Sequence, residues 1–233
     1  MNPPATSDPS ESLSTASRSG LYLITDTAII RGLPHQEAIQ KAIQGGLKFL
    51  QYREKSLTPS ISYEVAMVQR RIAQEAGVIF IVNDDVSLAL AVEADGVHLG
   101  QEDLPIREAR KILGGQSLIG VSTHSVQEAL AAEKDGADYI GLGPIYHTTT
   151  KQTRPPLGCG IIREVKEKVR IPIFAIGGIN LINLKEVLEA GATGVALISA
   201  ILTSPDIAQA TRTFLETISS VKMAHPGPHR EAQ

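Results

Sequence analysis

Eight short runs of mainly aliphatic and β-branched residues recur along the chain, and each is followed by an amphipathic stretch. Runs of this kind predict strands, whereas apolar residues at helical spacing predict helices. The expected strands cover 21–25, 47–52, 78–83, 95–99, 117–122, 138–143, 172–176 and 193–198. The expected helices cover about 35–44, 61–76, 86–92, 105–113, 125–135, 159–168, 183–190 and 205–219. This alternation constrains the fold more than any other feature of the sequence.

Parallel strands joined by helices need right-handed crossovers, and eight such units close into a barrel. Glycine often stands between a helix and the next strand, as at Gly77 and Gly191, which is typical of such units. The alternative is an open doubly wound sheet with a dinucleotide site. That fold requires a glycine-rich turn after the first strand, where the chain has Thr25-Asp26-Thr27 instead. We therefore predict an α/β fold, a single-domain (β/α)8 TIM barrel with its chemistry on the loops after the strands.

The composition fits one globular domain. The chain has 233 residues, of which 42% are hydrophobic, and aromatic residues reach only 4%, so an aliphatic core is expected. A net charge of −3 disfavours nucleic-acid and membrane partners, and no apolar run reaches the ~18 residues of a membrane span. The lone cysteine, Cys159, excludes an intrachain disulfide. We expect a cytoplasmic protein with small-molecule partners, and a homo-oligomer is compatible with these totals.

Both ends of the chain are polar. Residues 1–20 are rich in Ser, Thr and Pro and predict a disordered leader. A cleaved transit peptide is the alternative, which the acidic residues of this segment and its single arginine disfavour. Residues 222–233 predict a flexible tail, so the expected barrel covers 21–221.

The second expected strand ends in a cluster of polar and charged residues. Two-residue periodicity places Gln51, Arg53 and Lys55 on the same face as Phe49. If this face points inward, an amide, a guanidinium and an ammonium meet at the mouth of the barrel. An anion such as a diphosphate would compensate for their desolvation. The alternative is a solvated strand end with an internal pair to Glu54.

Carboxylates follow the next two strands. Asp84 and Asp85 come directly after the third strand, and Asp103 follows the fourth. Two carboxylates, together with phosphate oxygens and water, make an ordinary Mg²⁺ site. The alternative is that Asp85 and Asp103 only cap the helices that follow. The neighbouring cationic strand end favours the metal site.

Two further loops have a phosphate-binding composition. The connection after the sixth strand contains Thr148, Thr149, Thr150 and Lys151 and spans roughly a dozen residues or more, which suits a phosphate site or a mobile lid, or else a plain solvated loop. The glycines at 177–178 and the residues at 198–200 fall where many barrels bind phosphate through backbone N–H groups. The alternative is that the glycines only permit close strand-to-helix packing.

The histidines show no metal-binding spacing. His98, His124 and His147 fall at three different strand ends, and no H-E-x-x-H motif occurs. We expect a structural role for His98 and a position near substrate for His124. No Ser/His/Asp order or activated cysteine is visible, so covalent catalysis is not indicated.

Taken in order, these motifs resemble the thiamine phosphate synthase family. The segments that carry the resemblance are Q-Y-R-E-K at 51–55, N-D at 83–84, D-G-V-H-L-G-Q-E-D-L-P at 95–105, G-V-S at 120–122, G-L-G-P-I-Y at 141–146, T-T-T-K at 148–151, I-G-G-I at 176–179 and I-S-A at 198–200. The resemblance implies condensation of 4-amino-2-methyl-5-hydroxymethylpyrimidine diphosphate with a thiazole phosphate. The products would be thiamine phosphate and pyrophosphate, with CO₂ as well from a carboxylated thiazole, by a dissociative mechanism in which the diphosphate leaves first.

The resemblance also implies roles for single residues. The pyrimidine diphosphate would be held by Gln51, Tyr52, Arg53, Glu54, Lys55, Asn83, Ser122 and Lys151, and Arg53, Lys55, Ser122 and Lys151 would be catalytic. The thiazole phosphate would be held by Thr148, Thr149, Thr150, Gly178, Ile198 and Ser199. Asp84 and Asp103 would bind one Mg²⁺ per site. Two positions depart from the usual sequence pattern of the family. His147 stands where proline is commonest, and Asp85 stands where arginine is common.

Two other functions remain as alternatives. A thiazole tautomerase of the same fold group would isomerise the thiazole phosphate and would not require the cationic strand end, the acid pair or Lys151. A non-catalytic phosphate-sensing barrel would bind ligand without Mg²⁺-dependent release of pyrophosphate.

Overall fold

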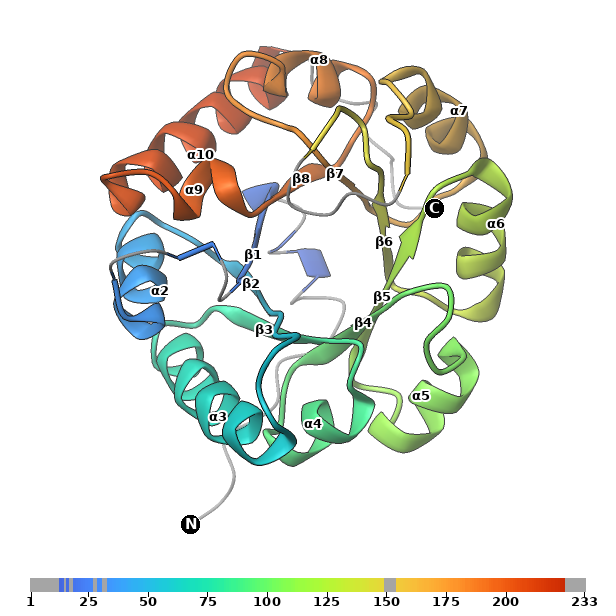
Figure 1. The fold of residues 1–233 in the computed structure, drawn as a ribbon. Helices are drawn as coiled ribbons and strands as arrows, with labels where there is room; N and C mark the ends of the chain where they lie inside the picture. Colours follow the sequence, from blue (N-terminus) through green and yellow to red (C-terminus); the bar gives the residue numbers. More distant parts are fainter. Residues whose placement is uncertain are drawn as a thin grey trace.

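The structure, a computed structural model, describes residues 13–14, 16, 19–26, 29–30, 33–148 and 154–224. Eight parallel strands pair in sequence order, and the last strand pairs with the first to close a barrel (Figure 1). The strands are β1 (Leu21–Ile24), β2 (Phe49–Tyr52), β3 (Ile79–Asn83), β4 (Gly96–Leu99), β5 (Leu118–Thr123), β6 (Tyr139–Leu142), β7 (Ile173–Ile176) and β8 (Gly194–Leu197). The predicted (β/α)8 barrel is confirmed.

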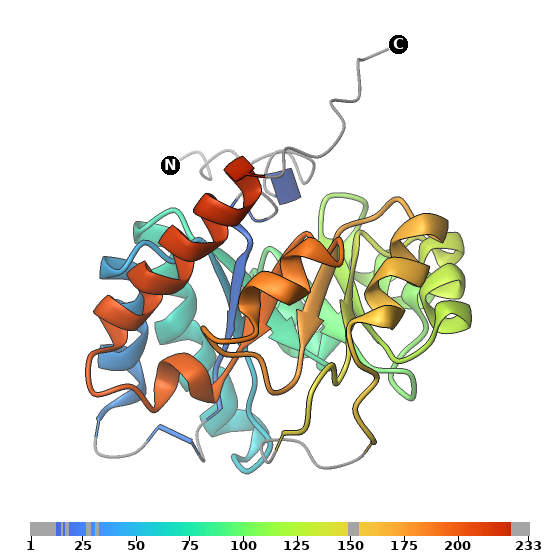
Figure 2. The ribbon, with the colours of Figure 1, turned by 90° about the horizontal axis from the view of Figure 1, so that it is seen from above.

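Helices surround the strands in a ring. They are α2 (His35–Gln44), α3 (Pro59–Glu75), α4 (Val86–Ala91), α5 (Ile106–Leu113), α6 (Val126–Asp135), α7 (Gly160–Lys168), α8 (Leu184–Glu189), α9 (Ser199–Leu202) and α10 (Ile207–Ala224). The last helix, α10, packs between α8 and α2 and completes the ring, as Figures 1 and 2 show. Among the described residues, no helix has both the length and the apolar character needed to cross a membrane.

Two helical segments differ from the sequence prediction. The short helix α9 begins directly after β8 and was not predicted, because four residues are too few to show helical periodicity. Helix α10 continues to Ala224, five residues beyond the expected end at 219, and its late residue Val221 packs against the core. The residues after Ala224, which belong to the expected tail, lie outside the described residues.

The core has two layers of different composition. The layer between strands and helices is mainly aliphatic, as predicted. The barrel interior is instead built on the rings of Tyr22, Phe49, Tyr139 and Phe174, so the prediction of a wholly aliphatic core is wrong there. Tyr22 stacks on Phe49 with ring centroids 3.8 Å apart, and the other rings pack edge to face around them. Few aromatic residues suffice because the small interior needs only a few large side chains.

The end of the barrel opposite the cavity described below is closed by residues that precede β1. Ala16 is fully buried, and Leu13 packs against the interior aromatic cluster. The backbone N–H of Gly20 donates to the Ala16 carbonyl at 2.9 Å. These described residues therefore belong to the barrel although the expected leader extended to residue 20, and the other residues of that leader lie outside the described part of the chain.

Candidate active site

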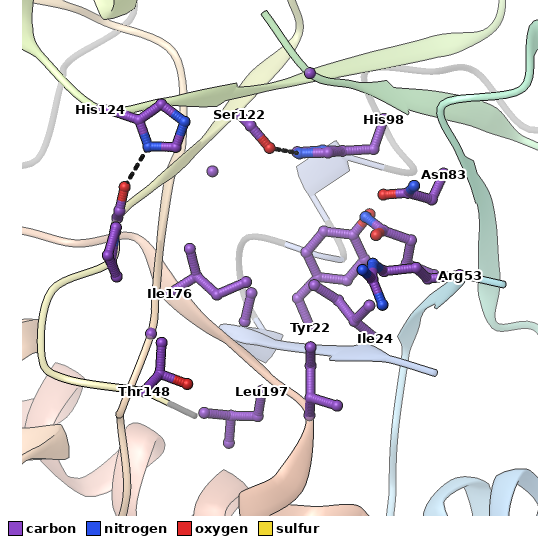
Figure 3. A pocket seen from close by; sticks show the side chains of 18 of the residues that line it. Tyr22, Ile24, Arg53, Asn83, His98, Ser122, His124, Thr148, Ile176 and Leu197 are labelled. Carbon is purple, nitrogen blue, oxygen red and sulfur yellow. Dashed lines mark hydrogen bonds between the residues drawn. The ribbon is translucent and has the colours of Figure 1, made fainter. Parts of the chain in front are cut away.

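A cavity of about 640 Å³ opens at the C-terminal ends of the strands (Figure 3). Every strand, or the loop that follows it, contributes to its lining. Because the carboxyl ends of parallel strands meet at one rim, residues far apart in sequence share this space. The cavity therefore lies where the sequence predicted the chemistry.

The alternation of side chains along β2 separates the residues of the Q-Y-R-E-K segment. Gln51 and Arg53 line the cavity, as the two-residue period predicts. Tyr52 lies on the opposite face, 2% exposed, and its hydroxyl donates to the Ser62 carbonyl of α3 at 3.2 Å. Glu54 accepts hydrogen bonds at 2.6–2.7 Å from Ser56 and from the backbone N–H of Lys55, so it shapes the turn after the strand. The structure thus brings neither Tyr52 nor Glu54 to the cavity.

Two ion pairs hold the cations at the end of β2. The Arg53 guanidinium donates to Asp26 at 2.6 Å, and both side chains are largely buried. Lys55 forms an ion pair with Asp84 at the exposed rim. Sequence reasoning missed Asp26, which follows β1 and lies 27 positions from Arg53. Its position directly after a strand was the available signal.

The backbone places Asp84 at the cavity in an unusual conformation. Its φ of 62° lies in the left-handed region, and its N–H donates to the His98 carbonyl at 2.8 Å. Such a conformation is uncommon for a residue with a side chain and is often found at functional sites. The turn ties the end of β3 to β4 and directs Asp84 toward Asp103.

Asp84 and Asp103 form an acid pair, with their side chains hydrogen-bonded to each other. Burial opposes ionisation of Asp84, but hydrogen bonds from Lys55 and Asp103 outweigh it and lower the pKa of Asp84. Burial and the neighbouring Asp84 raise the pKa of Asp103. A divalent cation would relieve the repulsion between the two carboxylates when both are ionised.

The acid pair fits a Mg²⁺ ion, which usually takes only one or two protein carboxylates. Within the described residues no group of three or more His, Cys, Asp and Glu side chains could hold a metal, so further ligands would be oxygens of substrate and water. The capping alternative is confirmed for Asp85, which accepts from Leu88 N at 2.8 Å at the start of α4. It is wrong for Asp103, which accepts from Gly100 N at 2.6 Å instead.

The opposite wall of the cavity is built from the loops after β6, β7 and β8. Thr148, Gly178, Ile198 and Ser199 all line it. Gly178 has a φ of +64°, and a Cβ there would lie 2.4 Å from the His147 carbonyl oxygen. Glycine is therefore required both by the backbone conformation and by the close approach of the β6 loop. Thr149, Thr150 and Lys151 lie outside the described residues.

The middle of the cavity is bordered by β4 and β5. Nε2 of His98 lies 3.0 Å from the Ser122 hydroxyl, and a dashed line marks this hydrogen bond in Figure 3. His98 is buried and hydrogen-bonded, as a structural histidine should be, but it also lines the cavity. His124 lines the cavity too, with Nδ1 hydrogen-bonded to the Gly143 carbonyl.

Other lining residues were not predicted from the sequence. They include Tyr22, Gln101 and Arg154. Tyr22 faces the interior by the same two-residue period that identified Gln51, so that signal was available for it. Arg154 lies in an irregular stretch, where no periodicity indicates the direction of a side chain.

Comparisons with known proteins identify the family of this chain. The family model described as thiamine monophosphate synthase matches residues 21–201. A thiamine-phosphate synthase of Methanospirillum hungatei is 48% identical over 198 residues, which cover 84% of this chain and 96% of the relative. One of Chloroflexus aurantiacus is 46% identical, covering 85% and 92%. A solved thiamine phosphate pyrophosphorylase from Pyrococcus furiosus has a TM-score of 0.81 at 39% identity, covering 89% of this chain and 98% of that one. This chain therefore belongs to the thiamine monophosphate synthase family.

Proposed function

We propose that this chain condenses 4-amino-2-methyl-5-hydroxymethylpyrimidine diphosphate with a thiazole phosphate to give thiamine phosphate and pyrophosphate. A carboxylated thiazole would also release CO₂. The observation that carries this proposal is that one cavity has two walls of different composition, each with groups suited to binding an anion. Arg53 and the Asp84–Asp103 pair lie on one wall, and Gly178 and Ser199 lie on the other. Two phosphorylated substrates can therefore meet between them.

The diphosphate of the pyrimidine substrate belongs on the first wall. The guanidinium of Arg53 presents a planar set of donors suited to phosphate oxygens, and Asn83 and Gln51 offer amide groups beside it. Lys55 reaches the same rim through its ion pair with Asp84. Lys151 is proposed to complete this set on the strength of the family motif.

Asp84 and Asp103 would hold a single Mg²⁺, which would supply positive charge to the diphosphate as it departs. Their close approach supports this assignment, because two adjacent carboxylates repel each other when both are ionised and a divalent cation relieves that repulsion. The turn at Asp84 keeps the two carboxyl groups together before any ligand binds.

The second wall would hold the thiazole phosphate. Thr148 and Ser199 offer hydroxyl groups, and the turn at Gly178 allows a phosphate to approach the backbone closely. Ile198 adds apolar contact, and Thr149 and Thr150 are included from the family motif. The substrates would then lie with the thiazole nitrogen facing the pyrimidine methylene carbon.

The reaction breaks the carbon–oxygen bond to the diphosphate, which keeps the bonding electron pair. The resulting cation is stabilised by the pyrimidine's own 4-amino group, and the lone pair of the thiazole nitrogen then forms the new carbon–nitrogen bond. No protein nucleophile is needed. The side chains of Arg53, Lys55 and Lys151 would neutralise the departing charge, and the two walls would hold the reactants in line.

The test is to incubate both substrates with the full chain, with and without Mg²⁺, and to measure thiamine phosphate and pyrophosphate. We expect equal amounts of the two products, formed only with Mg²⁺. Isomerised thiazole phosphate without pyrophosphate would establish a tautomerase instead. Binding of both substrates without turnover would establish a phosphate sensor. Either result would overturn the proposal. Synthesis without Mg²⁺ would overturn the assignment of the metal site.

A further inference from the structure

A chain of hydrogen bonds crosses the barrel interior next to the cavity. The Gln51 amide Nε2 donates to the Tyr22 hydroxyl at 2.7 Å, and the hydroxyls of Tyr22 and Tyr139 are 2.8 Å apart. The Tyr139 hydroxyl lies 3.3 Å from Nδ1 of His98, whose Nε2 lies 3.0 Å from the Ser122 hydroxyl. These five side chains come from five different strands and link Gln51 to Ser122, both of which line the cavity.

The direction of this chain follows from counting donors. An amide NH₂ group can only donate, so the Tyr22 oxygen accepts from Gln51 and the Tyr22 hydrogen goes to Tyr139. Tyr139 in turn donates to His98 Nδ1. With the Gln51 amide nitrogen facing Tyr22, the opposite direction would leave the Tyr22 hydrogen without an acceptor in a buried interior, which is unfavourable.

The tautomer of His98 is the consequence. A neutral imidazole whose Nδ1 accepts a hydrogen bond carries its hydrogen on Nε2, and this nitrogen faces Ser122. The Ser122 oxygen therefore accepts from His98. The hydrogen of the Ser122 hydroxyl is then directed to an acceptor in the cavity.

Packing holds the middle of the chain in place. Tyr139 is fully buried and does not line the cavity, and burial raises the pKa of both tyrosine hydroxyls, so both stay protonated. A Cβ at position 120 would lie 2.1 Å from Cζ of Tyr139 and 2.5 Å from Nδ1 of His98. Only glycine at this position lets the phenol and the imidazole meet.

We infer that Tyr139 is a positioning residue for the proposed reaction: through His98, it keeps the Ser122 hydroxyl as a hydrogen-bond donor to the departing diphosphate. The inference rests on the proposed function. A donor aimed at an oxygen that gains negative charge stabilises the transition state more than the bound substrate. Loss of Tyr139 should therefore lower kcat rather than raise KM.

The first test is kinetic and uses Tyr139→Phe, Ser122→Ala and the double variant. We expect Tyr139→Phe to lower kcat about 10-fold with little change in either KM, in line with weakening one positioned donor. In the Ser122→Ala background the same change should have no further effect, because Tyr139 acts through Ser122. The inference would be overturned if the double variant lost kcat by the product of the two single-variant factors. Tyr52→Phe is the matched control, since it removes a buried hydroxyl that bonds to Ser62 outside the cavity.

The second test needs no substrate. Nitrogen-15 NMR of labelled protein distinguishes a bare ring nitrogen from a protonated one, and His98→Gln identifies the signals. We expect a bare Nδ1 and a protonated Nε2 in the unmodified chain, a changed tautomer population in Tyr139→Phe, and no change in Tyr52→Phe. A protonated Nδ1 in the unmodified chain would overturn the inference. If the chain makes no thiamine phosphate, the proposed function fails, whereas this measurement still decides the direction of the hydrogen-bond chain.

Discussion

The Asp26 carboxylate accepts a 2.6 Å hydrogen bond from the Arg53 guanidinium, and their side chains are only 12% and 18% exposed. This pair joins the loop after β1 to the end of β2 and fixes the direction of the guanidinium. Removing one partner of such a pair leaves the other charge poorly compensated and free to move.

We therefore expect Asp26→Ala to lower kcat/KM for the pyrimidine diphosphate by about 10-fold or more, because a misdirected Arg53 no longer meets the diphosphate. Steady-state kinetics at saturating thiazole phosphate would measure this. Glu37→Ala is the control, since it breaks the exposed pair with Lys41, and such pairs contribute little. Unchanged kinetics in Asp26→Ala would contradict the role given to Arg53.

The acid pair makes metal binding depend on pH. The pKa of Asp103 is raised by burial and by Asp84, whereas the pKa of Asp84 is lowered. Mg²⁺ requires both carboxylates to be ionised, so its affinity should be full above the raised pKa of Asp103 and fall below it. For one competing proton, the Mg²⁺ affinity falls by at most about 10-fold per pH unit. Calorimetric titration of Mg²⁺ in the presence of pyrophosphate, from acid to neutral pH, would measure it.

Asp103→Asn should weaken Mg²⁺ binding at neutral pH and flatten this pH dependence. The neighbouring Asp85→Ala should leave Mg²⁺ binding unchanged and lower the free energy of unfolding by about 1 kcal/mol, because it removes only the cap of α4. Equal loss of metal affinity in both variants would argue against the assignment of the pair.

Gly178 and Gly77 offer a comparison at nearly equal backbone geometry, with φ of +64° and +62°. Alanine at either position should cost about 1 kcal/mol of stability from conformation alone. Only at Gly178 does the added Cβ meet another atom, the His147 carbonyl oxygen at 2.4 Å, whereas nothing lies within 4 Å at Gly77. Gly178→Ala should therefore also raise KM for the thiazole phosphate about 10-fold, by displacing the wall that holds it. Equal KM values in the two variants would refute this.

Lys222 on α10 is partly buried, and burial lowers the pKa of its ammonium to about 8 from an ordinary value of 10.5. Between these values the unfolded chain binds more protons than the folded one, so this residue makes stability rise with pH over that window. Below about pH 8 the ammonium is charged in both the folded and the unfolded chain, so its desolvation destabilises the folded state by the full amount. Lys222→Met should stabilise the protein at pH 7 and remove this rise, as urea unfolding at several pH values would show. Exposed Lys134→Met should do neither.

The fold followed from the sequence because the barrel repeats one local pattern eight times. The same two-residue period that separates strands from helices also placed Gln51 and Arg53 on the cavity side of β2. It equally implied that Tyr52 points the other way, which motif resemblance alone did not take into account. The two-residue period of the strand was therefore more informative about side-chain direction than resemblance to the family motif.

Features that depend on the three-dimensional register were not predictable. The predicted strand order puts the loop after β1 beside the end of β2, but no sequence spacing shows that Asp26 pairs with Arg53. Likewise, composition could not place the few aromatic rings inside the barrel rather than beneath the helices. The contact of Asp84 with Asp103 also depends on the left-handed turn at Asp84, a conformation that residues other than glycine adopt only occasionally.

The aromatic rings of Tyr22, Phe49, Tyr139 and Phe174 fill the barrel next to the cavity, so the residues that the structure describes leave no passage through its centre. Both substrates and both products must then travel through the same entrance at the strand ends. Pyrophosphate remaining inside would block the next pyrimidine diphosphate from docking. The order in which the two products depart thus becomes a determinant of turnover, set by the packing of the barrel interior.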